Sequence, residues 1–233
     1  MTKDELINEI FKLGINLSDE QINKLEIYKD YLIKYNKHTN LTRIDDEENI
    51  FLKHFYDSLT IIKYINLNNY KKLLDLGSGA GFPGVVLKIV YPFLDVTVLD
   101  SNNKKTIFLN KLKEKLNIDY NIIHDRAEHY ILENRESYDI VVSRAMANLS
   151  VLLELSIPFV KIDGYFVAMK GNALEELKNS KNVEIKLGAK IESINKFELI
   201  KEKSQRTIIL YKKVNKTKDI YPRKYEKIIK KPL

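Results

Sequence analysis

The residues whose types and spacing most clearly predict chemistry form a glycine-rich segment, Asp75-Leu76-Gly77-Ser78-Gly79-Ala80-Gly81-Phe82-Pro83-Gly84. An apolar run leads into alternating glycines, and Pro83 follows where the first turn of a helix would begin. Glycines suit a loop that must turn sharply and approach a ligand closely, because a Cβ atom would block that approach. A loop that merely turns the chain is the alternative. The strand expected before it and the helix expected after it favour a ligand site.

Two classes of ligand fit this loop. Residues 79–84 satisfy G-x-G-x-x-G, which is the fingerprint of dinucleotide-binding folds. Two residues separate that motif from the strand, however, and Pro83 lacks the N–H that a phosphate would need. Residues 75–81, D-x-G-x-G-x-G, resemble motif I of class I methyltransferases, which bind S-adenosyl-L-methionine. We therefore expect that cofactor, and a nicotinamide-dependent oxidoreductase is the competing interpretation.

Further candidates follow the ends of the next predicted strands. Asp100 lies 19 residues after Gly81, the interval at which a carboxylate meets an adenosine ribose. Its alternative role is to cap the helix that follows. The third strand ends at residues 125–128, where an adenine edge would be read, and the fourth brings Ser143 and Arg144 to the same edge of the sheet. Open α/β sheets bind their ligands at that edge.

The elements that must position these residues alternate between short apolar strands and helices. We predict strands near Lys72–Leu76, Val96–Asp100, Tyr120–Ile123, Ile140–Ser143 and Tyr165–Lys170, with helices after the first four. This order implies parallel pairing through right-handed crossovers. Two further strands, Ile185–Phe197 and Arg206–Tyr211, are expected to form an antiparallel edge. The predicted fold class is α/β, a Rossmann-like class I methyltransferase sheet that is mostly parallel, with an antiparallel C-terminal edge.

The N-terminal part is predicted to be a helical extension packed on this sheet. Thr2 with Glu5 and Ser18 with Gln21 have capping-box spacing, so helices should begin near residues 3 and 19. A third helix is expected from about Glu47 to Tyr64, after a polar run at residues 36–40. The predicted organisation is a helical extension (1–65), a cofactor-binding methyltransferase domain (66–211) and a basic tail (212–233).

Composition narrows the function classes. The chain has 233 residues, 44% of them hydrophobic, which suffices for one full α/β core. Cysteine is absent, so disulfides, thiolate metal sites and cysteine nucleophiles are excluded, and we expect no metal. The chain shows neither a signal-peptide pattern nor a run of 18 apolar residues. We expect a cytoplasmic protein with no membrane partner.

The charge is concentrated at the C-terminal end. Residues 212–233 hold nine Lys or Arg against two acidic residues, which accounts for the whole net charge of +7. Such an end suits phosphate backbones or anionic lipid, and a merely solvated end is the alternative. Tyr221, Tyr225, Ile228 and Ile229 are interleaved among the lysines, which a purely solvating run would not need. We interpret the tail as an RNA-docking element, with docking on the sheet domain as the competing interpretation.

With these residues in hand, the chain closely resembles the bacterial small-subunit ribosomal RNA guanine-N7 methyltransferases, the glucose-inhibited division protein B family. The resemblance covers nearly the whole chain, and it departs from the family pattern at Tyr35 and at Tyr225-Glu226. Besides the glycine loop, the matching segments are residues 35–42 (YNKHTNLT), 54–59 (HFYDSL), 100–101 with 104–105 and 108–109, 126–128 (RAE), 143–145 (SRA), 221–223 (YPR) and 230–233 (KKPL). Asn40-Leu41-Thr42 followed by His54-x-x-Asp57-Ser58 is the most specific of these.

The resemblance implies an S-adenosyl-L-methionine-dependent methyltransferase that acts on N7 of a guanine in 16S ribosomal RNA, either free or within the small ribosomal subunit. Together with the strand-end positions, it predicts cofactor contacts at Gly77, Gly79, Phe82, Asp100, Ser101, Asn102, Ala127, Glu128 and Arg144. It implies RNA contacts at Asn40, His54, Asp57, Arg223, Lys224, Lys230 and Lys231. Judged by spacing alone, the side chains of His54 and Asp57 would instead form their hydrogen bonds within the helix or the core.

No catalytic acid or base is predicted. Guanine N7 carries a lone pair and no proton, so positioning is the main task of such an enzyme. A methyltransferase acting on a protein or a small molecule is the runner-up interpretation.

Overall fold

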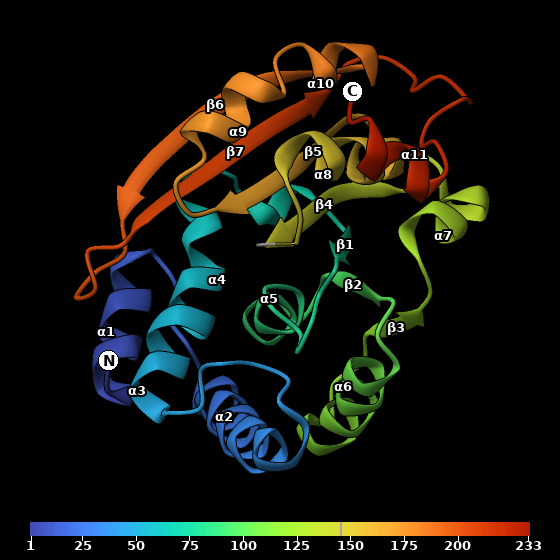
Figure 1. Cartoon of the computed structure of the whole chain (residues 1–233). Helices are drawn as coiled ribbons and strands as arrows, with labels where there is room; N and C mark the ends of the chain where they lie inside the picture. Colours follow the sequence, from blue (N-terminus) through green and yellow to red (C-terminus); the bar gives the residue numbers. More distant parts are fainter. Residues whose placement is uncertain (145) are drawn as a thin grey trace.

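A seven-stranded sheet forms the centre of the computed structural model, which describes residues 1–144 and 146–233 (Figure 1). The strands, in chain order, are β1 (Lys72–Leu76), β2 (Asp95–Asp100), β3 (Asn121–His124), β4 (Tyr138–Arg144), β5 (Val160–Lys170), β6 (Ala189–Glu198) and β7 (Gln205–Lys213). Their order across the sheet is β3-β2-β1-β4-β5-β7-β6. β1 to β5 pair in parallel, while β7 runs antiparallel to both β5 and β6. The predicted fold class is confirmed.

Helices flank the sheet, and a helix follows each of the first four strands, as predicted. The α-helices are α1 (Lys3–Lys12), α2 (Asp19–Thr39), α3 (Glu47–Asn49), α4 (Asp57–Leu59), α5 (Gly84–Val90), α6 (Asn103–Leu116), α7 (Ala127–Asn134), α8 (Leu149–Ser156), α9 (Leu174–Asn179), α10 (Val183–Lys186) and α11 (Tyr225–Lys230). The 3-10 turns are η2 (Thr60–Lys63), η3 (Leu67–Asn69) and η4 (Ile157–Phe159). Within the described ranges, no helix has the length and apolar character needed to cross a membrane.

The sheet is buried on both faces, because successive side chains of a strand point in opposite directions. Leu73 belongs to an apolar cluster that includes residues of α1, α2, α5 and α6. Its neighbour Leu74 belongs to a second cluster, which includes residues of α7, α8, α10 and α11. Two helical layers therefore enclose the sheet (Figure 1). The N-terminal helices belong to the first layer, and the C-terminal helix belongs to the second.

The N-terminal extension begins with the two predicted capping boxes, both of which are present at Thr2 and Ser18. α2 runs to Thr39, so most of the polar run expected to separate helices is helical. Only Asn40 leaves the helix, with a left-handed φ of 52°, a conformation that asparagine tolerates well. Asn36 is buried, and its side chain pairs with both backbone groups of Thr42. This pairing satisfies the hydrogen-bonding groups of a polar side chain that is buried in the helix.

Two further expectations need correction. The helix predicted from about Glu47 to Tyr64 is interrupted by a π-helical segment, η1 (Ile50–Tyr56), and ends in a 3-10 turn. β6 begins at Ala189 rather than at Ile185, because α10 occupies the preceding residues and Gly188 turns the chain at a φ of +85°. The last residue of the motif at 143–145, Ala145, lies outside the described residues.

Candidate active site

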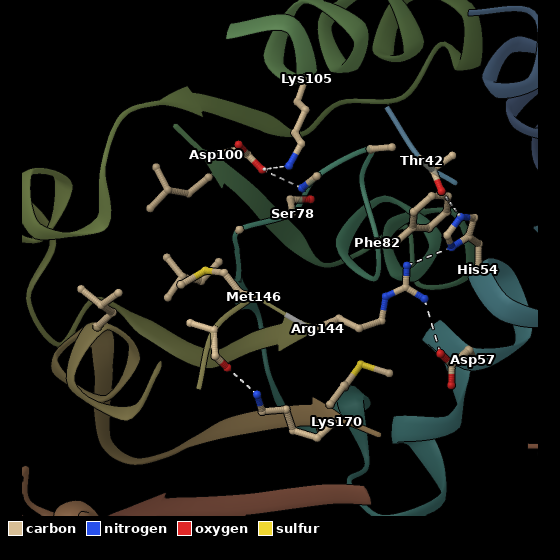
Figure 2. A pocket seen from close by; sticks show the side chains of 18 of the residues that line it. Thr42, His54, Asp57, Ser78, Phe82, Asp100, Lys105, Arg144, Met146 and Lys170 are labelled. Atoms are coloured by element: carbon tan, nitrogen blue, oxygen red, sulfur yellow. Dashed lines mark hydrogen bonds and ion pairs between the residues drawn. The ribbon is translucent and has the colours of Figure 1, made fainter. Parts of the chain in front are cut away.

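A cavity of about 650 Å³ opens at the carboxyl ends of the parallel strands. Its walls include Gly77 after β1, Asp100 at the end of β2 and Arg144 at the end of β4. β1 and β4 are neighbours in the sheet, although β2 and β3 follow β1 in the chain. The strand order reverses at this point, which is where open α/β sheets bind ligands. Figure 2 shows the side chains around the cavity.

The glycine loop turns sharply at the mouth of this cavity. Gly77 has a φ of +70°, and a Cβ atom built on it would lie 2.4 Å from Sδ of Met146. Only glycine fits this backbone without strain. The amide of Gly79 donates a hydrogen bond of 2.9 Å to Oδ2 of Asp100, so the loop is held against the end of β2.

Asp100 does not act as the helix cap. The cap of α6 is Asn102, whose side chain accepts a hydrogen bond of 2.9 Å from the amide of Lys104. Asp100 accepts from Gly79 with one oxygen and from the amide of Asn102 with the other, at 2.9 Å each. Nζ of Lys105 lies 3.5 Å from its Oδ2 (Figure 2). The carboxylate therefore links the loop to the start of α6.

Asp75 stabilises the glycine loop by accepting hydrogen bonds from two of its residues. Its Oδ2 accepts from the hydroxyl of Ser78 at 2.6 Å and from the amide of Gly84 at 2.8 Å. The side chain is fully buried, and this burial raises the pKa of Asp75 to about 6 despite the two hydrogen bonds. The aspartate noted in the sequence pattern therefore has a structural task within the loop.

Arg144 is the centre of a cluster on the other side of the cavity. Its Nη2 lies 3.0 Å from Nδ1 of His54, and its Nη1 donates to the carbonyl of Lys53 at 2.7 Å. Oδ2 of Asp57 lies 3.4 Å from the same Nη1, while Nε of Arg206 donates to Oδ1 of Asp57 at 3.1 Å. The wide turn of η1 carries both Lys53 and His54, and Asp57 follows directly. The π-helical segment and the residue after it therefore present three groups to one guanidinium.

His54 is neutral in this cluster. Burial and the charge of Arg144 lower the pKa of His54 to about 3. Because Arg144 is a donor only, Nδ1 accepts from it, and the proton stays on Nε2. Nε2 then donates to the hydroxyl of Thr42, 3.1 Å away (Figure 2). Both imidazole nitrogens are thereby used.

Phe82 lies between this cluster and the N-terminal helices. Its ring is parallel to the His54 ring, with centroids 4.2 Å apart, and to the Tyr28 ring at 5.2 Å. The guanidinium of Arg144 lies 5.2 Å from the centre of the same ring. The hydroxyl of Tyr28 donates to the carbonyl of Ala80. Tyr28 thus fixes the glycine loop from α2, which explains why the helical extension packs where it does.

Most of the predicted cofactor residues meet at the cavity. Those that line it are Gly77, Gly79, Phe82, Asp100, Ser101, Ala127, Glu128 and Arg144. Asn102 does not line it, since its side chain is used to cap α6. The structure adds residues that the site prediction did not include: Thr42, Lys105, Arg206 and Tyr225. Thr42 and Lys105 belong to segments quoted above, but no spacing rule distinguishes Arg206 and Tyr225.

The residues predicted to contact RNA are distributed over the molecule. His54 and Asp57 are buried and line the cavity, whereas Asn40 is exposed at the end of α2. In the tail, Lys224, Lys230 and Lys231 are exposed. Arg223 differs from them, because its guanidinium pairs with Glu154 at 2.6 Å, and Glu154 is fully buried. Among residues 1–144 and 146–233, no group of three or more acidic or histidine side chains could hold a metal ion.

Comparison with known sequences gives one consistent family. Residues 21–209 match the family model described as rRNA small subunit methyltransferase G. The protein of Acetivibrio thermocellus called ribosomal RNA small subunit methyltransferase G is 48% identical over 231 residues, which cover 98% of this chain and 95% of that protein. The protein of the same name from Bacillus subtilis is 43% identical over 96% of this chain and 95% of its own length.

Solved structures show the same fold at low identity. TYW2 of M. jannaschii, determined in complex with AdoMet, has a TM-score of 0.57 and 12% identity, and the match covers 74% of this chain and 80% of that one. The ribosomal protein L11 methylase of Lactobacillus delbrueckii has a TM-score of 0.52 and 12% identity over 70% of this chain and 80% of that one. At such identities the likeness concerns the arrangement of the sheet and its helices.

Proposed function

This chain belongs to the rRNA small subunit methyltransferase G family, and from that membership we propose that it methylates N7 of a guanine in 16S ribosomal RNA. It is an S-adenosyl-L-methionine-dependent rRNA methyltransferase, as the family name and the fold agree. The choice of guanine N7 is the finer part of the proposal. A ribosomal RNA substrate would place the reaction in the bacterial cytoplasm, where ribosomes assemble.

The cavity fits the cofactor that this reaction needs. Its volume of about 650 Å³ is within the range of sites for ligands of this size. At Gly77 a Cβ would collide with Met146, which also lines the cavity, and at Asp100 a carboxylate stands where a ribose is expected. We propose that Gly77, Gly79 and Asp100 hold the cofactor, together with Phe82, Ser101, Ala127, Glu128 and Arg144. When bound, S-adenosyl-L-methionine supplies an electrophilic methyl group on a sulfonium.

The observation that carries the guanine-N7 assignment is the state of His54. It is the only histidine among the residues that line the cavity, and its two nitrogens are engaged with Arg144 and Thr42. With its pKa lowered to about 3, it is a poor base at neutral pH. An acceptor that must lose a proton would need a base other than His54. Guanine N7 needs none, so orientation against the methyl group suffices.

The methyl acceptor is expected to enter on the side of the cavity opposite to Asp100. That side is lined by Thr42 and Ile44 of the segment after α2, by Phe197 of β6 and by Arg206 and Ile208 of β7. It therefore combines apolar walls that suit a flat base with a cation that suits RNA. Arg144 lies on this same side, and we propose that it positions the acceptor and does not protonate it.

Candidate phosphate contacts lie on exposed segments. Lys224, Lys230, Lys231 and Asn40 are exposed, and we keep them as proposed RNA contacts. The guanidinium of Arg223 is occupied by the buried Glu154, which favours a structural role for this residue. The tail therefore divides into an anchored part and an exposed lysine-rich part.

Methyl transfer to defined acceptors tests the proposal. The purified chain would be incubated with methyl-labelled S-adenosyl-L-methionine and, in separate reactions, with small-subunit RNA, small subunits, large-subunit RNA and ribosomal proteins. RNA and subunits should come from a strain that lacks the gene, so that the target is unmethylated. We expect label only where small-subunit RNA is present. Label in the protein fraction, or equal label in large-subunit RNA, would contradict the proposed substrate.

A further inference from the structure

We propose that the C-terminal helix α11 is part of the cofactor site, with the Tyr225 ring as the outer wall of its adenosine end. This inference depends on the proposed function, because it concerns the same cofactor. It assigns Tyr225, one of the aromatic residues of the basic tail, to cofactor binding instead of RNA docking. The observation behind it is that Tyr225 lines the cavity, although it is 125 residues later in the chain than Asp100.

The first step is that the tail has a fixed path over the protein. Nε and Nη2 of Arg223 donate to the two oxygens of Glu154 at 2.8 and 2.6 Å, and the backbone amide of Arg223 donates to the same carboxylate at 2.9 Å. Glu154 lies on α8 and is fully buried. A buried carboxylate needs these three donors, so the contact is costly to break. The helix α11 begins with Tyr225, only two residues later.

A second anchor precedes this one, and a third follows it. Arg135, directly after α7, donates to the carbonyls of Thr217 and Tyr221 at 3.2 and 2.6 Å. Ile228 is fully buried and packs in the apolar cluster between the sheet and α8. α11 lies against α8 and near α7 (Figure 1). Contacts before and after Tyr225 in the chain therefore fix the position of α11 on the sheet domain.

The position of Tyr225 relative to the cavity is set by α7. The guanidinium of Arg126, the residue directly before that helix, lies 5.4 Å from the centre of the Tyr225 ring. Ala127 and Glu128 follow directly and line the cavity, as does Asp125. These residues stand at the carboxyl end of β3, next to Asp100 at the end of β2 and to Ser101, which follows it. The Tyr225 ring therefore closes the end of the cavity at which the base attached to the ribose would lie.

The chemistry of this wall fits adenine. A base is flat and apolar on its faces, and aromatic side chains or a guanidinium plane are the groups on which bases stack. Arg126 and Tyr225 offer one of each, with the guanidinium over one face of the ring. Tyr225 also lines a second groove, between α7 and α11, together with Arg126 and Glu128. Removing the ring would merge this groove with the cavity and expose the base to water.

Binding measurements on single variants of the full chain test the inference. Calorimetry with S-adenosylhomocysteine and, separately, with adenosine would be done on Tyr225→Ala, Tyr225→Phe and Ile229→Ala. Ile229 is the matched control, because it lies on the same helix, is half exposed and does not line the cavity. For Tyr225→Ala we expect Kd to rise about tenfold for both ligands, the effect of losing one stacking partner. Tyr225→Phe and Ile229→Ala should bind like the wild type.

The pattern across variants and ligands decides the outcome. Unchanged affinity in Tyr225→Ala would overturn the inference, and so would equal losses in Ile229→Ala, since the cause would then be the docking of α11. A loss for S-adenosylhomocysteine but not for adenosine would also overturn it, because the contact would not be at the adenosine end. A wild-type chain that binds neither ligand would instead refute the proposed function itself.

A fluorescent variant gives an independent measurement. The chain has no tryptophan, so Tyr225→Trp would carry the only indole, at the wall in question. We expect adenosine to change its emission with the Kd found by calorimetry. Tyr221→Trp, four residues earlier on the anchored segment and absent from the cavity lining, is the control and should not respond. An unresponsive Tyr225→Trp that still binds adenosine would contradict stacking at this position.

Discussion

The guanidinium of Arg144 donates a hydrogen bond to Nδ1 of His54 across 3.0 Å. Arg144 ends the central strand β4, whereas His54 belongs to the N-terminal extension, 90 residues earlier. The contact joins the two parts of the chain at the cavity. It also decides the protonation of the histidine, because a cation this close opposes a second positive charge.

The neutral state of His54 should appear in the pH dependence of stability. Its pKa falls from an ordinary value of 6.5 to about 3 on folding, so its contribution is present above pH 6.5 and is lost as the pH falls towards 3. Relative to His54→Asn, which can still accept from Arg144, the wild-type free energy of unfolding should decrease by up to about 1.4 kcal/mol per pH unit below pH 6.5. Denaturant unfolding at pH 7.5, 6 and 5 measures this. A constant difference across that range would mean that His54 titrates normally.

Replacement of Asp100 even by asparagine should impair cofactor binding. Both carboxylate oxygens accept from backbone amides, so the NH2 of an asparagine would have to face one of them. We expect Asp100→Ala and Asp100→Asn each to weaken S-adenosylhomocysteine binding by about 1.5–3 kcal/mol. Asp95→Asn, at the opposite end of β2, is the control and should bind within about 0.5 kcal/mol of the wild type. Wild-type affinity in both Asp100 variants would reject the ribose site.

Valine substitutions at Gly77 and Gly14 separate the effect of backbone strain from the effect of a steric collision at the cavity. Both have a positive φ, +70° and +84°, but nothing lies within 4 Å of a Cβ built on Gly14. Gly77→Val and Gly14→Val should each lower stability by about 1–3 kcal/mol through strain. Only Gly77→Val should lose S-adenosylhomocysteine binding in calorimetry. If a folded Gly77→Val protein bound normally, the glycine loop would not form the cofactor site.

The anchored part of the tail should matter for stability. Arg223→Ala removes the partner of a carboxylate that is fully buried, and we expect the free energy of unfolding to fall by about 3 kcal/mol. The neighbouring Lys224→Ala, which is exposed, should cost less than about 0.5 kcal/mol. The salt dependence of RNA binding should show the reverse pattern, with a change for Lys224→Ala only. A stable Arg223→Ala variant with a flattened salt slope would instead make Arg223 an RNA contact.

Local rules predicted the sheet, because each strand is a short apolar run followed by turn residues. β1 was expected at residues 72–76 and lies there, and both capping boxes start their helices as predicted. The glycine loop was recognisable for the same reason, since the conformation at Gly77 depends on a few neighbouring residues. Such features are encoded within a window of about ten residues.

Features that depend on distant contacts were not predictable in this way. The π-helical turn at Ile50–Tyr56 accompanies a hydrogen bond from Arg144 to the carbonyl of Lys53, and no local pattern encodes that partner. The pairing of Arg223 with Glu154 joins residues 69 positions apart, so the sequence of the tail could not reveal it and Arg223 was assigned to RNA. Tyr225 was counted as an aromatic of the tail, and only the fold places it at the cavity.

The identity of the methylated nucleoside tests the central claim most directly. Small-subunit RNA from a strain lacking the gene would be treated with the purified chain and methyl-labelled S-adenosyl-L-methionine, digested to nucleosides and analysed by mass spectrometry. We predict 7-methylguanosine as the labelled nucleoside, and much less of it with the Asp100→Ala variant at a cofactor concentration near the wild-type Kd. Label on a different atom or a different base, produced by the wild-type chain, would contradict methyl transfer to guanine N7.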